Sequence, residues 1–109
     1  MADATSVRIV KRGNEQFGGL WGPIWAVSAT IDADNLADGA GDTDTVAVNG
    51  VALGDQVLSV GFGVDTAGMT VTAWVSAANT VSLRFQNESG GAVNLASTTV
   101  KLVVGRPVW

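Results

Sequence analysis

The sequence has no cysteine, no histidine and no tyrosine. Without cysteine the chain can build neither a disulfide framework nor a thiolate site. Without histidine it lacks the commonest general base and a common metal ligand. Carboxylates such as Asp55 remain, but no base, nucleophile or cluster of metal ligands accompanies them. We therefore do not expect an enzyme, and we expect neither a cofactor nor a catalytic metal.

Charge is also scarce. Charged residues make up 15% of the 109 residues, where about 25% is usual in soluble domains. The formal net charge is −4, which argues against a nucleic-acid partner.

No apolar run is long enough to cross a membrane, and the opening MADATSVRIV has neither the basic start nor the apolar stretch of a signal peptide. A small monomer needs more polar surface than this to stay dispersed, so we expect partners to cover part of the apolar surface. The alternative is a compact sandwich rich in Thr, Ser and Gly.

Only two prolines accompany 14 glycines, which favours frequent corners between short strands over a linker. Apolar residues alternate with small or polar ones, and this period of two predicts strands with one buried face each. The predicted inward faces are Trp25, Val27, Ala29 and Ile31; Leu58, Val60, Phe62 and Val64; Met69, Val71, Ala73 and Val75; Val81, Leu83 and Phe85; and Val100, Leu102 and Val104. With no convincing helix, this predicts an all-β chain folded as an antiparallel β-sandwich of seven or eight short strands, of which a jelly roll is one form. We expect residues 25–109 to form this domain and residues 1–24 to form an N-terminal arm and apolar loop.

Two turns organise the pattern. In the stretch Thr45–Val60, Asn49-Gly50 and Gly54-Asp55 predict two bends between neighbouring strands. Farther on, pairing Ser76 with Thr80 leaves a three-residue loop whose last member, Asn79, should adopt the left-handed conformation.

The same hairpin register sets Trp74 opposite Ser82 and Thr72 opposite Arg84, on a polar face. Arg84 then lies diagonally within reach of a cation–π contact with Trp74. Trp74 is either covered by the loop that carries Trp21, or it faces another subunit or a ligand.

The segment Asp32–Asp44 holds five of the ten acidic residues. It lacks the ligand spacing of a calcium loop, since Leu36 occupies the fifth position and Ala37 the sixth. We expect a solvated acidic loop, and the alternative is a weak surface cation site at Asp42 and Asp44.

The N-terminal segment combines cations with large apolar residues. Residues 7–12 carry half of the six cations, and they form either an arm that docks on an acidic partner or an edge strand protected by charge. The glycine-rich stretch 13–24 either folds back over the core or forms an interface, which we prefer. The C-terminal tryptophan should anchor the tail on this subunit or a neighbour. The candidate interface residues are Arg8, Lys11, Arg12, Phe17, Leu20, Trp21, Trp74 and Trp109.

Two sequence stretches carry a resemblance to a known group of proteins. They are Val48-Asn49-Gly50-Val51-Ala52-Leu53-Gly54-Asp55, and Val75-Ser76-Ala77-Ala78-Asn79-Thr80-Val81 followed by Arg84, Asn87 and a Gly-Gly turn. Over about residues 26–105 the chain resembles the small β-sandwich proteins of tailed bacteriophages that act as capsid decoration, or cement, proteins or as head or tail fibre modules. These motifs are turn chemistry and not a catalytic signature. Asn49 departs from the Pro-Gly corner associated with that pattern, although the turn stays intact.

The resemblance implies a homotrimer that sits on a phage capsid, assembled in the host cytoplasm and bound to the major capsid protein. Such a protein needs a rigid scaffold and apolar surface to bury, and it stabilises the assembled lattice because it binds that state selectively. The alternative is a carbohydrate-binding or host-binding module of a phage head or tail fibre, since four Trp residues in a chain without Tyr offer aromatic faces for sugars.

Overall fold

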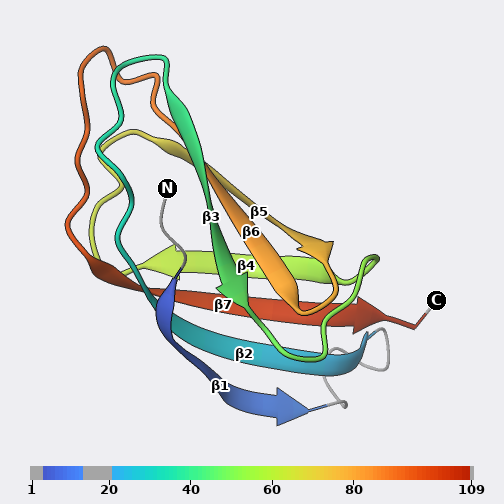
Figure 1. Cartoon of the computed structure of the whole chain (residues 1–109). Helices are drawn as coiled ribbons and strands as arrows, with labels where there is room; N and C mark the ends of the chain where they lie inside the picture. Colours follow the sequence, from blue (N-terminus) through green and yellow to red (C-terminus); the bar gives the residue numbers. More distant parts are fainter. Residues whose placement is uncertain (1–3, 14–20, 109) are drawn as a thin grey trace.

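The computed structural model describes residues 4–13 and 21–108, and it places the side chains of all of these except residues 9–13. The chain is an antiparallel β-sandwich, as expected (Figure 1). Its seven strands are β1 (Thr5–Gly13), β2 (Trp21–Ile31), β3 (Gly41–Ala47), β4 (Gln56–Phe62), β5 (Thr70–Ala77), β6 (Thr80–Gln86) and β7 (Thr98–Pro107).

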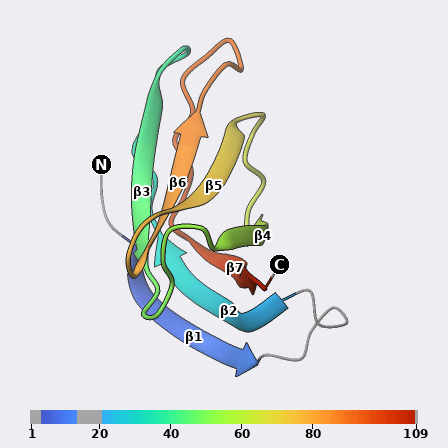
Figure 2. The ribbon, with the colours of Figure 1, turned by 90° about the vertical axis from the view of Figure 1, so that its right-hand side faces the viewer.

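The strands form a four-stranded sheet in the order β1-β2-β7-β4 and a three-stranded sheet in the order β3-β6-β5. The strand pairs are nested, because β2 pairs with β7 and β3 with β6. The three-stranded sheet crosses the four-stranded one steeply (Figure 1), and the four-stranded sheet curves beneath it (Figure 2). The molecule measures 44 × 26 × 22 Å.

The core between the sheets follows the predicted alternation. All four inward residues predicted for β2 are buried, as are all three predicted for β6 and all three for β7. On β5, Val75 is buried, and Val71 and Ala73 are half-buried against the core. The largest fully buried side chain is Trp25.

The β5–β6 hairpin has the predicted register from Thr70 to Val75, with Trp74 opposite Ser82. Asn79 has a φ of 62°, so the prediction of a left-handed residue is confirmed. The prediction for the last pair was wrong, because Ala77 and not Ser76 pairs with Thr80 after a register shift. The displaced Ser76 hydroxyl instead lies 2.7 Å from the Ser82 hydroxyl.

Strand β4 departs from its predicted face. Its pairing with β7 shifts between Val57 and Ser59, which is a β-bulge. Val57 therefore packs against the core with Val60 and Phe62, whereas Leu58 turns to the outer face. A period of two cannot report an inserted residue, so the predicted inward position of Leu58 was wrong.

The N-terminal region is part of the sheet. β1 pairs with β2 from Thr5 to Gly13, with two register shifts, so the edge-strand alternative holds for this segment. β2 begins at Trp21 and not at Trp25, so the boundary expected after residue 24 falls inside a strand. Pro23 is tolerated there because it lies in a register shift between Trp21 and Ile24, where the ladder requires no N–H from it.

The expected acidic loop is shorter than predicted. β3 already begins at Gly41, and Asp44 is fully buried, so the alternative of a surface cation site at Asp42 and Asp44 is wrong for Asp44. The remaining loop is held to the loop after β6 by the buried Asn87, whose Nδ2 donates to the carbonyls of Leu36 (2.9 Å) and Gly91 (2.8 Å).

Candidate functional site

The structure places the candidate interface residues on different parts of the fold. Arg8 is exposed on β1, the backbones of Lys11 and Arg12 pair with β2, and Trp21 opens β2. Trp74 lies on the other sheet, in β5. Phe17, Leu20 and Trp109 lie outside the described residues.

Trp21 packs on the outer face of the four-stranded sheet, over Gly105 of β7. A Cβ added at Gly105 would lie 2.8 Å from Trp21 Cε3 and 3.1 Å from both Ile24 Cδ1 and Leu58 Cδ1. These three side chains close over the glycine as a small second apolar cluster. The close approach explains why a residue without a side chain occupies this strand position. Of the predicted apolar loop, Trp21 and Ile24 pack on their own subunit, and residues 14–20 lie outside the described residues.

The cluster lies at the end of the sandwich where β2 begins and β7 ends, which we call the Trp21 end. Besides the cluster of Trp21, Ile24 and Leu58, this end carries Leu53 and Val108. Leu53, at the tip of the corner between β3 and β4, is 72% exposed, and Val108 is 59% exposed. Two large aliphatic side chains thus project into solvent at the same end of the fold as a half-buried tryptophan, which is typical of an interaction surface.

An ion pair fixes the corner that carries Leu53. Arg106 Nε and Nη2 donate to the two oxygens of Asp55, both at 2.9 Å, and Nη2 also donates to the Gly50 carbonyl at 3.0 Å. The guanidinium lies 5.3 Å from the ring centroid of the buried Trp25. This planar, fork-like contact joins the end of β7 to the corner.

The ion pair also sets the ionisation of both partners. Burial alone would raise the pKa of Asp55, but the hydrogen bonds from Arg106 and the Ala52 N–H and the positive charge of Arg106 outweigh it, so the pKa lies below the ordinary carboxyl value. The hydrogen bond to Asp55 likewise raises the pKa of Arg106. Asp55, which the sequence left as a lone carboxylate, is therefore a structural anchor in the described part of the chain.

The outer face of the three-stranded sheet carries Trp74, which is 43% exposed. Arg84 does not reach toward it: its guanidinium donates to the Thr43 hydroxyl (3.3 Å) and to Gln86 Oε1 (3.4 Å). Trp21 belongs to the opposite sheet, so it does not cover Trp74. The residues that precede Trp21 in its loop, 14–20, lie outside the described residues.

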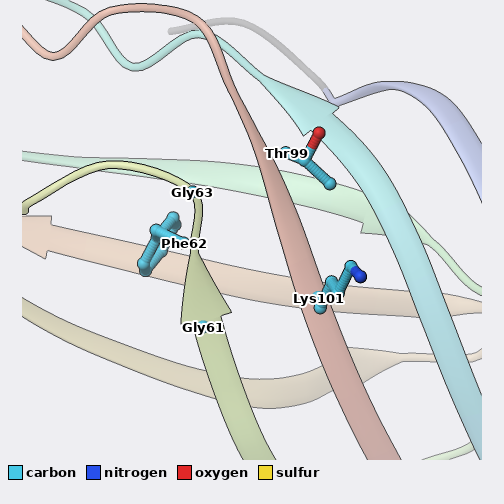
Figure 3. Close-up of a pocket in the computed structure, with 5 residues that line it drawn as sticks. All are labelled: Gly61, Phe62, Gly63, Thr99 and Lys101. Carbon is cyan, nitrogen blue, oxygen red and sulfur yellow. The ribbon is translucent and has the colours of Figure 1, made fainter.

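The outer face of the four-stranded sheet holds a cross-strand row that the sequence did not single out. Register places Arg8 beside Ser28, Ser28 beside Lys101, and Lys101 beside Gly61. Lys101 separates two open hollows, one of about 270 Å³ and one of about 190 Å³. Figure 3 shows Lys101 and Thr99 on β7 beside Gly61 and Phe62 of β4 and the Gly63 that follows them, around the larger hollow. We call this row and its hollows the Lys101 face.

Residues 4–13 and 21–108 contain neither a cluster of metal ligands nor a membrane-crossing helix. In them, no three Asp, Glu, His or Cys residues gather to hold a metal ion. Nor does this part of the chain contain a helix long and apolar enough to cross a membrane.

Comparison with known proteins found no matching family model, no similar curated protein and no similar solved structure.

Proposed function

We propose that this chain is a structural protein of a phage virion, a homotrimer that decorates a capsid and binds its major capsid protein. The resemblance of the two turn motifs to decoration proteins is one support. The described fold adds a second, because a sandwich with a small apolar cluster on one outer face suits binding.

The observation that carries the proposal is the Trp21 end. Leu53 and Val108 expose most of their side chains, while the Asp55–Arg106 ion pair holds the corner beneath them rigid. A pre-ordered apolar surface loses little conformational entropy on binding. Aromatic and aliphatic anchors near the centre of a contact often dominate its energy. We assign the shell contact to this end.

Cosedimentation with undecorated capsids tests the assignment. Leu53→Asp should weaken binding about tenfold or more, because it places a charge in an apolar contact, and the melting temperature should change little since the side chain is exposed. The matched control is Thr72→Asp, which introduces the same charge at an exposed position on the outer face of the three-stranded sheet, away from this end. Equal binding by wild type and Leu53→Asp would exclude this end as the shell contact.

A deletion of residues 1–12 is a poor test of the same idea. Residues 5–13 form β1, so the deletion would remove a strand and expose the edge of β2. Point substitutions keep the sheet intact and separate binding from folding.

A carbohydrate-binding module of a fibre is the second candidate, and Trp74 favours it. An exposed indole ring on a face bearing the exposed Thr72 and Arg84 combines a stacking surface with hydrogen-bonding groups. Titration with a panel of bacterial surface glycans, followed by Trp fluorescence, distinguishes the two. A saturable change that Trp74→Ala abolishes would support this candidate, and no change with any glycan favours decoration.

A further inference from the structure

The charges of this chain are segregated by the fold. The strands β1, β2, β7 and β4 contain five of the six Lys and Arg residues and none of the ten Asp and Glu residues. The remaining cation, Arg84, belongs to the three-stranded sheet. A chain with net charge −4 thus has one sheet whose strands carry only positive charge.

Two of these cations stand on the Lys101 face without partners. Arg8 and Lys101 are both exposed, and neither side chain makes a hydrogen bond or ion pair with any described residue. They lie in one row, two strands apart, which corresponds to about 10 Å. Their neighbours in the row, Ser28 and Gly61, are small, so a partner can approach both charges closely.

The acidic residues gather at the end opposite the Trp21 end. Here the loops 32–40, 63–69 and 87–97 follow β2, β4 and β6 (Figure 1). Loops 32–40 and 87–97 are bound together by backbone hydrogen bonds between Leu36 and Val93 and by a hydrogen bond from the Gly90 N–H to Asp38. The exposed acids of the three loops, which we call the acidic end, are Asp32, Asp34, Asp38, Asp65 and Glu88.

We propose that the Lys101 face of one copy binds the acidic end of a second copy, an inference that rests on the proposed homotrimer and names its interface. The contact joins two different surfaces of the same chain, and such a head-to-tail contact closes into a ring when its rotation permits. Each subunit then uses its cationic face once and its acidic end once. The Trp21 end remains free for the shell.

The shape of the Lys101 face suits a protein loop better than a small ligand. Hollows of about 270 Å³ and about 190 Å³ lie on either side of the lysine, and both are smaller than the range of about 300–1,000 Å³ that is usual for small-molecule pockets. They suit the side chains that flank acids in a partner's loop. Charge complementarity of this kind fixes the register of a contact and penalises wrong partners.

The test is charge reversal with rescue, measured as molar mass by light scattering coupled to size exclusion. Wild type should give three times 11.1 kDa, and its association should weaken as salt is raised. Lys101→Glu should weaken association about 10- to 100-fold, because it sets like charges against each other. Arg84→Glu, the same charge change on the other sheet, should leave the trimer intact.

Rescue makes the test specific. Lys101→Glu is combined in turn with reversal to Lys of Glu88, Asp65 or Asp32, and at least one combination should restore the trimer. A second variant, Gly61→Gln, fills the larger hollow without charge. A Cβ at Gly61 meets no atom within 4 Å in the free subunit, so this variant should fold normally and associate more weakly.

The possible results separate the proposed contact from the proposed decoration function. A trimer unchanged by Lys101→Glu, a monomeric wild type, or a dissociated Lys101→Glu that no reversal rescues overturns the contact. A trimer that fails to cosediment with capsids leaves this contact standing and overturns decoration. If the Lys101→Glu variant is still a trimer and still decorates capsids, the proposed contact is wrong and decoration stands.

Discussion

Gly105 allows Trp21 to lie against the outer face of the four-stranded sheet, and its replacement by alanine has a calculable effect. The added Cβ would lie 2.8 Å from Trp21 and 3.1 Å from Ile24 and Leu58. Overpacking of this kind costs about 1–3 kcal/mol. Alanine also restricts the unfolded chain more than glycine does, and this stabilises the folded state by about 0.4–1 kcal/mol. We expect Gly105→Ala to lower the free energy of unfolding by about 1–2 kcal/mol, which shifts the melting temperature of a domain this size by about 4–8 °C for each kcal/mol.

Gly61→Ala is the matched control, because it is the same substitution on the same face with open space around the new methyl group. It should raise the free energy of unfolding by about 0.5 kcal/mol. Both variants are measured by urea denaturation followed by Trp fluorescence and by thermal melting. In a Trp21→Ala background, the cost of Gly105→Ala should fall by about 1 kcal/mol, since the closest neighbour is gone. Equal effects of the two alanines would refute the packing of Trp21 over Gly105.

Three further substitutions test the core, the ion pair and the loop anchor. Leu83→Ala, at a fully buried position, should lower the free energy of unfolding in denaturant by about 2–5 kcal/mol. Leu53→Ala, at an exposed position, should change it by less than about 0.5 kcal/mol. Similar values for the two variants would mean that the strand faces are misassigned. Asp55→Ala should cost about 2–3 kcal/mol at neutral pH, because Arg106 loses its partner. Since the pKa of Asp55 is lowered in the folded state, the ion pair stabilises the fold fully above the unfolded-state pKa of about 3.9, and this stabilisation is lost as pH falls through the folded-state pKa. If the stability of Asp55→Ala depends on pH below about pH 4 in the same way as that of wild type, this reasoning is wrong. Asn87→Asp should lower the melting temperature at pH 7, because a carboxylate cannot donate to the two carbonyls that Nδ2 now bonds, and a melting temperature equal to wild type would remove the anchor role.

Alternation in the sequence was enough to predict the fold class and most inward faces. β2, β6 and β7 have a regular ladder beside the core, so every second residue is apolar and the pattern is complete. The β5–β6 register was predictable because a short loop leaves few ways to match two apolar faces, and Asn79 marks the left-handed position.

The errors have local causes. The bulge in β4 adds one residue at Leu58, and no glycine or proline at that position indicates a bulge in the sequence. Gly22-Pro23 signals a turn, yet β2 runs through it because a register shift removes the need for the proline N–H. Asp44 follows an acidic loop in the sequence, although its strand points it inward.

The candidate site was less predictable than the fold. Lys101 was recognisable as an outward residue of the last strand, but its alignment with Arg8 joins positions 93 residues apart and depends on two strand pairings. Trp21 appeared as an apolar loop residue, and only the tertiary structure sets it over Gly105. Single-sequence patterns report neighbours in the chain, whereas these surfaces are made by neighbours across a sheet.

The nested strand pairing has a consequence for the order in which the chain folds. The β5–β6 hairpin joins residues as close as Ala77 and Thr80, whereas β2 pairs with β7 across separations such as that between Trp25 and Val104. Closing short loops costs less entropy than closing long ones, and non-local strand pairing is slow. The hairpin therefore forms early, and the four-stranded sheet waits for the last ten residues of the sandwich. β1 stays at the edge of its sheet after β7 has been added, so its cations and the register shifts beside it protect an edge that is open both during synthesis and in the finished fold.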